Sequence, residues 1–275
     1  MKKISAFIIK NKIVIICVVL IFSLFLSSYQ NAWRHIFSNS TDLSKEKIAL
    51  AATYYGSKIF VWYGSFSHYA ILLLLMIPIL ITDYYASDYF LKKDIFIIYR
   101  QGFNKYYFDS LFRIVKIMLT VAVIPIIVYF GLVCIFFQSN NYAIEGASGI
   151  APFIPTIYIR SNFVLDILNK NIIYLYLFSS FLMIIATFIY GIFSYSIGIY
   201  IKQKYIRFVA PIIAMVMLDF ILNSFIFNLE DSLFFGLFNQ NFIMNPLYGL
   251  GYLFFILIIS VIMLVVHYHL RRNNG

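Results

Sequence analysis

Residues 83–116 read DYYASDYFLKKDIFIIYRQGFNKYYFDSLFRIVK, a charged and aromatic stretch that separates two long apolar runs. Its charged side chains are those of Asp83, Asp88, Lys92, Lys93, Asp94, Arg100, Lys105, Asp109, Arg113 and Lys116. Lipid cannot accommodate so much charge, so we expect a loop or short surface helices at a membrane face. Because lysine and arginine outnumber the acidic residues, the positive-inside rule places this face in the cytoplasm.

The composition of the chain is that of a membrane protein. Of its 275 residues, 63% are hydrophobic and 12% are charged, whereas soluble domains have roughly half apolar and a quarter charged residues. The formal net charge is +10, but the basic residues flank apolar runs and do not form the water-exposed basic face that nucleic acid requires. We therefore expect membrane lipid as a partner and no nucleic acid. Cys17 and Cys134 both lie within apolar runs, so no disulfide framework is predicted.

The apolar runs predict an all-α, multi-pass protein of the cell membrane, in which residues 1–275 form a single transmembrane domain. Six transmembrane helices are expected, at residues 7–28, 60–82, 111–137, 171–201, 208–228 and 247–269. Residues 1–12 alternate lysine with isoleucine and phenylalanine, which predicts a short N-terminal helix in the membrane interface. Fifteen of the 21 lysines and arginines fall in the segments expected inside, so both termini are predicted to be cytoplasmic.

Asp219 is the one acidic residue deep within an expected span. It follows Arg207, which belongs to a tight basic turn with Lys202 and Lys204, by twelve residues. That places it roughly 18 Å along the helix and near the midplane of a core about 30 Å thick. An ionised carboxylate there costs at least about 2.5 kcal/mol unless it is paired or faces water.

Two interpretations of Asp219 stay open. Asn223 is four residues further on and shares its helix face, so the two side chains are candidates for a cargo path or a proton site. Alternatively, Asp219 is protonated and forms a hydrogen bond with a neighbouring helix. Candidate partners for that bond are Thr120, Ser179 and Ser194.

No catalytic or metal-binding motif is visible in the sequence. His267 and His269 are two residues apart, so on a helix they point to different faces and cannot share one metal. None of the twelve glycines precedes a lysine, so there is no phosphate-binding loop. We therefore expect a protein that is not an enzyme and holds no catalytic residue, metal or cofactor of its own. Any use of ATP would require a separate chain.

The central stretch resembles the corresponding segment of the type-two ABC exporter permeases. Asp88 matches the acidic position of that family, Ile95–Arg100 its apolar run, and Asn104–Tyr107 the basic and aromatic stretch that enters the third span. Asp88 is followed here by YFLKKD, where the family usually has glycine. The layout is most similar to the small six-helix bacterial permeases of peptide, bacteriocin and antibiotic export or immunity systems.

The resemblance implies a permease subunit that forms the path for a peptide, lipid or antibiotic-like cargo. It also implies short cytoplasmic coupling helices between spans two and three, docked on a separate ATPase that binds ATP and Mg²⁺. Gly102 is expected to end the second of these helices. The residues expected at the docking surface are Asp88, Lys92, Lys93, Ile95, Phe96, Tyr99, Arg100 and Lys105.

Such a permease forms half of a pathway, so a dimer with itself or with a similar permease is expected. The small residues Ser194 and Gly198 are a possible seam. Two other classes of function remain alternatives. One is an ion-coupled secondary transporter that uses Asp219, and the other is a membrane immunity or scaffold protein that transports nothing.

Overall fold

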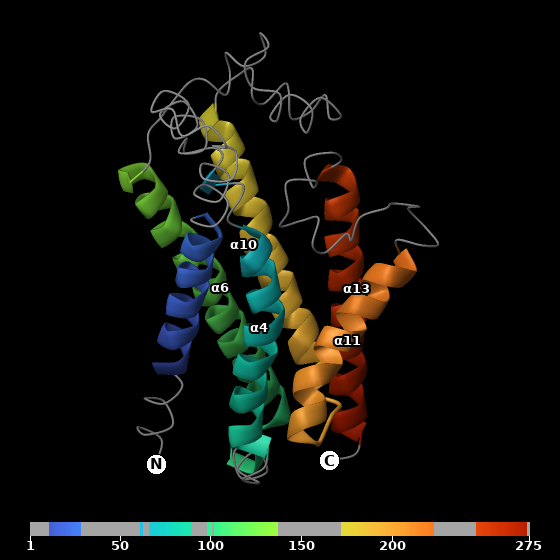
Figure 1. Cartoon of the computed structure of the whole chain (residues 1–275). Coiled ribbons are helices and arrows are strands. Elements are labelled where there is room, and N and C mark those ends of the chain that lie inside the picture. Colours follow the sequence, from blue (N-terminus) through green and yellow to red (C-terminus); the bar gives the residue numbers. More distant parts are fainter. Residues whose placement is uncertain are drawn as a thin grey trace, which may run out of the picture.

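A computed structural model describes residues 11–28, 61–62, 66–89, 98–100, 102–136, 172–222 and 246–273. All regular secondary structure within these ranges is helical. The helices are an N-terminal helix Asn11–Ser28, α4 (Phe66–Tyr89), α6 (Phe103–Phe136), α10 (Ile172–Gly198), α11 (Lys204–Leu222) and α13 (Pro246–Asn273). They run side by side in one bundle (Figure 1).

Five of the described helices are long and apolar enough to cross a membrane. Their membrane-compatible parts are Asn11–Ser28, Phe103–Phe136, Ser180–Gly198, Lys204–Leu222 and Leu250–Arg272. This architecture confirms the prediction of an all-α, multi-pass membrane protein. Helix α4 has a shorter apolar part, Tyr69–Ile81, so the second of the six expected spans stays a prediction.

Gly102 determines where α6 begins. Its φ angle is +82°, which glycine adopts without steric cost, and its N–H donates to the carbonyl of Ile98 at 2.8 Å. That bond closes the helical turn at residues 98–100, and the two coupling helices expected before α6 stay a prediction. The carbonyl of Gly102 in turn accepts a bond from the N–H of Tyr106 at 3.2 Å. Helix α6 therefore starts at Phe103, well before the span expected to begin at residue 111.

Helix α10 is the interior helix of the bundle. It packs extensively against α4, α6, α11 and α13. Apart from the contacts of α10, the most extensive contact among these helices is that between α4 and α11. Of its apolar stretch, 67% is buried, against 28% to 39% in the other four spanning helices. Those four helices therefore expose apolar faces on the outside of the bundle, as lipid contact requires.

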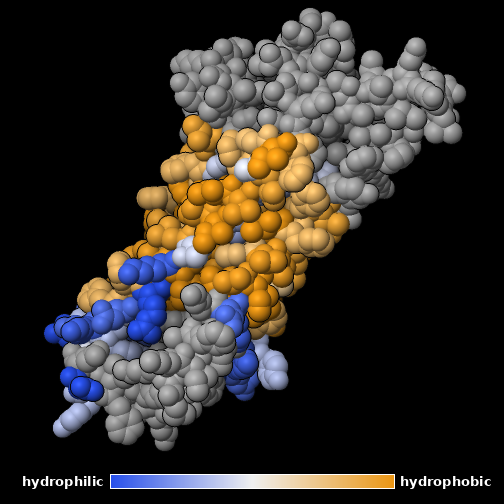
Figure 2. All heavy atoms as spheres, turned by 90° about the vertical axis from the view of Figure 1, so that its left-hand side faces the viewer, coloured by the Kyte–Doolittle hydropathy of each residue, from blue (hydrophilic) through white to orange (hydrophobic). Residues whose placement is uncertain are grey.

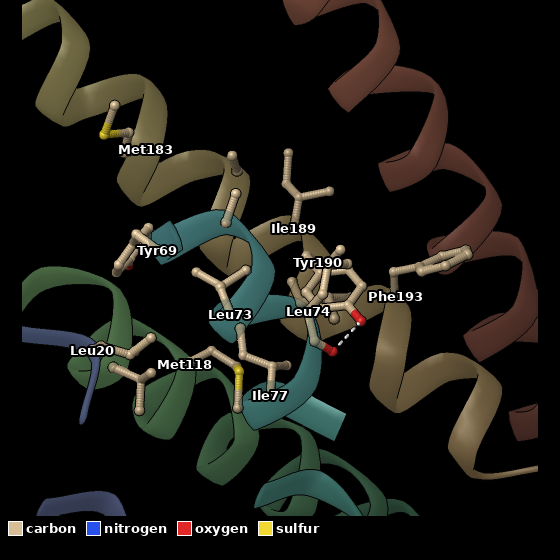
Figure 3. Close-up of a cluster of buried hydrophobic side chains, with 14 of the residues drawn as sticks. Leu20, Tyr69, Leu73, Leu74, Ile77, Met118, Met183, Ile189, Tyr190 and Phe193 are labelled. Carbon is tan, nitrogen blue, oxygen red and sulfur yellow. Dashed lines mark hydrogen bonds between the residues drawn. The ribbon is translucent and has the colours of Figure 1, made fainter. Parts of the chain in front are cut away.

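The core forms where α4, α6 and α10 meet the N-terminal helix. Figure 3 shows Leu20, Leu73 and Met118 pointing into one cluster from three different helices, and all three are fully buried. A Cβ at Gly191 of α10 would lie 2.3 Å from Sδ of Met118. The absence of a side chain at Gly191 therefore allows α6 and α10 to approach closely.

Several polar side chains inside the bundle form hydrogen bonds with other parts of the chain, as expected where water is excluded. The hydroxyl of Tyr190 on α10 donates to the carbonyl of Leu74 on α4 at 2.9 Å (Figure 3). The hydroxyls of Tyr69 and Thr187 lie 3.4 Å apart and join the same two helices. These contacts fix α4 against α10 in both register and rotation.

The basic side chains within the described ranges all lie toward one end of the bundle, where α13 ends and the N-terminal helix begins. They are Lys12, Arg100, Lys105, Arg113, Lys116, Lys202, Lys204, Arg207, Arg271 and Arg272. In Figure 2, hydrophilic surface gathers at this end, below a broad apolar belt. The arrangement agrees with the charge asymmetry in the sequence. We call this part of the molecule the basic end.

The close approach at Gly191 yields a testable prediction. Gly191→Ala should lower the stability of the bundle by about 1–3 kcal/mol, because the added methyl group overlaps the buried Met118 side chain. The measurement is thermal unfolding of the purified protein in detergent. Gly131→Ala on α6 is the matched control, since a Cβ there meets nothing within 4 Å and alanine favours a helix. Equal melting temperatures for the two variants would contradict the proposed packing.

Candidate functional site

An aromatic cluster joins three parts of the chain at the basic end. Its rings belong to the first turns of α6, the turn between α10 and α11, and the last turns of α13. The members are Phe103, Tyr107, Phe108, Tyr200, His267 and Tyr268. The start of α6 follows directly on Gly102, so the cluster lies beside the segment that the sequence indicated as a coupling element.

Tyr107 is the central ring of the aromatic cluster. Its centroid lies 5.3 Å from that of Tyr268 at an angle of 63°, and 6.4 Å from that of His267. The ring centroid of Phe103 lies 5.6 Å from that of Tyr268. Tilted and edge-to-face aromatic pairs at these distances stabilise a fold by more than the burial of their surface alone. The rings therefore form a specific contact between α6 and α13.

Three tyrosine hydroxyls add directional bonds to this contact. That of Tyr107 donates to the carbonyl of Leu264 at 2.8 Å, and that of Tyr268 donates to Oδ1 of Asn104 at 2.8 Å. The hydroxyl of Tyr200, in the turn after α10, donates to the carbonyl of Met263. Each hydrogen bond of this kind contributes roughly 0.5–1.5 kcal/mol to the free energy of unfolding. Together they fasten the start of α6 and the α10–α11 turn to the end of α13.

Arg207 fixes the α10–α11 turn from inside. Its Nε donates to the carbonyl of Ile201 at 2.9 Å, and its Nη2 donates to the same carbonyl and to that of Lys202 at 3.3 Å. The side chain is 1% exposed. A Cβ at Gly198 would lie 3.3 Å from Cγ of Arg207, so glycine makes room for the arginine stem. The sequence placed Arg207 in a basic turn but gave no sign that it is buried.

This packing corrects one sequence prediction. Ser194 and Gly198 were expected to form a seam with a second copy, but both are buried within the chain. The backbone of Gly198 faces Arg207 and Ile81. Small residues permit close helix approach in both settings, so the sequence alone does not distinguish an internal contact from a dimer contact.

Three of the predicted docking residues are described, and all are accessible. Tyr99 is 95% exposed, and Arg100 and Lys105 are exposed on either side of Gly102. Asp88 belongs to the last turn of α4, but its side chain lies outside the description. The predicted residues Lys92, Lys93, Ile95 and Phe96 fall outside the described ranges.

Asp219 lies on the buried face of α11 and is 9% exposed. It lies close enough to Tyr252 of α13 for the two groups to interact electrostatically. The Tyr252 hydroxyl also donates to Sδ of Met215, one turn before Asp219, at 3.6 Å. The sequence did not indicate Tyr252 as a neighbour, and the expected partner Thr120 instead donates to the carbonyl of Lys116 in its own helix. Asn223 lies outside the described ranges.

Within the described part of the chain, no group of three or more histidine, cysteine, aspartate or glutamate side chains is placed to hold a metal ion. Comparisons of the chain with models of protein families, with curated proteins and with solved structures gave no match. Membership of a family is therefore not shown, and the resemblance to exporter permeases stays a prediction.

The aromatic cluster makes a second prediction. Tyr268→Phe and Asn104→Ala should each destabilise the bundle, and the double variant should lose less than the sum, with a coupling energy of about 0.5–1.5 kcal/mol. Thermal unfolding in detergent measures all three variants. Tyr205→Phe, at a side chain that is mostly exposed, is the control. Additive losses, or a Tyr268→Phe variant as stable as the control, would show that the bond between Tyr268 and Asn104 does not hold the helices together.

Proposed function

We propose that this chain is the permease subunit of an ATP-driven exporter and that its basic end faces the cytoplasm, where it docks on a separate ATPase. The observation that carries the proposal is the position of the exposed turn at residues 98–100. This turn lies at the basic end, and only Gln101 and Gly102 separate it from α6 in the sequence. An ATPase bound there acts directly on a membrane-spanning helix.

The contacts around this turn supply a mechanical route into the bundle. The hydrogen bonds on both sides of Gly102 link the turn to the first turn of α6, so a push on the turn displaces α6. Tyr107 and Tyr268 hold that part of α6 against α13. Gly191 then passes the movement to α10 by its close contact with α6. In this proposal, closure of the ATPase moves α6, α10 and α13 together.

The energy for transport comes from the partner in this proposal, which binds ATP and Mg²⁺. The cargo is a peptide, a lipid or an antibiotic-like molecule. A second permease, either a copy of this chain or a similar one, completes the pathway. Because Ser194 and Gly198 are internal, the contact between the two permeases must use other residues.

The alternative of an ion-coupled transporter depends on Asp219, which lies on the buried face of α11. Such a transporter would need no ATPase. The other alternative, a membrane immunity or scaffold protein that transports nothing, differs from the proposed permease in the partners that it needs. A scaffold needs no ATPase, whereas the proposed permease co-purifies with one.

Pull-down of the native ATPase tests the docking surface. Tyr99→Ala and Arg100→Glu should each lower the amount of bound ATPase at least about tenfold, the change expected when a contact of about 1.4 kcal/mol is lost. Both side chains are exposed, so insertion and folding should not change. Arg272→Glu is the matched control, because it reverses an exposed base at the same end on another helix.

Two outcomes would contradict the proposal. One is a native chain that brings down no ATPase. The other is an Arg100→Glu variant that retains as much ATPase as the native chain does.

A further inference from the structure

The outward face of α6 changes from charged to apolar along its length. Phe112, Arg113 and Lys116 are all exposed, and the next exposed large residues on this helix are Leu119 and Ile124. A helix that enters lipid from water shows such a change at the boundary between headgroups and acyl chains. The level of these three residues relative to the apolar surface of α13 therefore shows whether they lie within the lipid-facing part of the bundle.

The aromatic cluster sets the relative depth of the two helices. The bond between Tyr107 and Leu264 places these residues at one level. Near that level α13 exposes the apolar side chains of Val261, Val265 and Val266, of which nearly half the surface is accessible. The apolar surface of the bundle thus extends down to Tyr107. Figure 2 shows hydrophilic side chains bordering the lower edge of an apolar belt.

Lys116 therefore lies within the depth of the apolar surface. It is nine residues beyond Tyr107, which corresponds to at most about 13 Å along the helix axis toward the membrane interior. A lysine or arginine exposed to hydrocarbon costs roughly 2.5–3.5 kcal/mol on insertion scales, unless its charged group reaches polar surroundings. The phosphates of the headgroup layer are the nearest anions that a membrane offers.

The direction of the side chains favours such a contact. In an α-helix the Cα–Cβ bonds tilt toward the N-terminus, and the N-terminus of α6 lies at the basic end. Arg113 and Lys116 therefore extend from the belt toward the headgroups. The Nζ atom of Lys116 lies 4.5 Å from the ring centroid of Phe112, one turn closer to the basic end, which agrees with this direction.

We infer that Phe112, Arg113 and Lys116 form a binding surface for the phosphate group of an anionic phospholipid. Arg113 and Lys116 donate charge-assisted hydrogen bonds to the phosphate oxygens. The Phe112 ring supports the ammonium group of Lys116 and contacts the upper part of the acyl chains. This site requires only that α6 spans a membrane, so it holds whether or not an ATPase docks at the turn at residues 98–100.

Lipid selectivity of the purified full-length chain tests the inference. The native chain is placed in nanodiscs of phosphatidylglycerol and phosphatidylcholine, and the lipids that remain bound are counted by native mass spectrometry. In the double variant Arg113→Gln/Lys116→Gln the preference for phosphatidylglycerol should fall about 30-fold, as expected for the loss of two basic residues near an anionic surface. Lys116→Arg should retain the preference.

The double variant Lys202→Gln/Lys204→Gln is the matched control, because it removes two exposed bases from the same end of the bundle. It should keep the preference for phosphatidylglycerol. The inference fails if Arg113→Gln/Lys116→Gln keeps the preference, or if both double variants lose it equally, which would indicate diffuse attraction by surface charge. It also fails if Arg113→Gln/Lys116→Gln changes only the ratio of monomer to dimer, which would make this face a contact between two copies. Melting temperatures of all variants identify any that do not fold.

Discussion

The exclusion of charge from lipid is the constraint on which the rest of this structure depends. Every lysine and arginine in the described ranges lies toward one end of the bundle. The apolar parts of five helices remain to cross the membrane, and each has at least 18 residues, within the range of lengths found for membrane-spanning helices. Polar groups that remain inside are more stable when they bond to other parts of the chain, as Tyr190 and Tyr69 do between α4 and α10. In the buried Arg207, Nε and Nη2 donate to carbonyls of the turn between α10 and α11.

The interior position of α10 follows from how helices pack when lipid is the solvent. Hydrophobicity does not drive helices together there, so close packing and hydrogen bonds must do so. Gly191 brings α10 against α6, and Gly198 leaves room for the stem of Arg207. The aromatic cluster then fastens α6 to α13 at the basic end, where tyrosine and histidine suit a boundary between apolar and polar surroundings. A rigid connection among α6, α10 and α13 beside an exposed turn is what a chain moved by an external partner needs.

Part of this arrangement was predictable from the sequence because it depends on local patterns. Apolar length and charge asymmetry predicted a multi-pass helical protein, and Gly102 predicted a helix end because a positive φ angle favours glycine. Contacts between distant residues were not predictable in this way. The bonds of Tyr107 with Leu264 and of Tyr190 with Leu74 join helices that are far apart in the chain, and no spacing rule predicts them. Ser194 and Gly198 were correctly recognised as small packing residues but were assigned to the wrong neighbour.

The described basic residues of the different helices all lie toward one end of the bundle, which we expect on one side of the membrane, and single-cysteine labelling tests that arrangement most directly. In a background with both native cysteines replaced by alanine, one cysteine at a time is placed at Lys12, Lys105, Lys204 or Arg272, which lie on four different helices. A maleimide that cannot cross membranes should label all four variants in inverted membrane vesicles and none of them in intact cells. Labelling of any one of these positions from outside intact cells would contradict this arrangement. The basic residues of the four helices would then lie on different sides of the membrane.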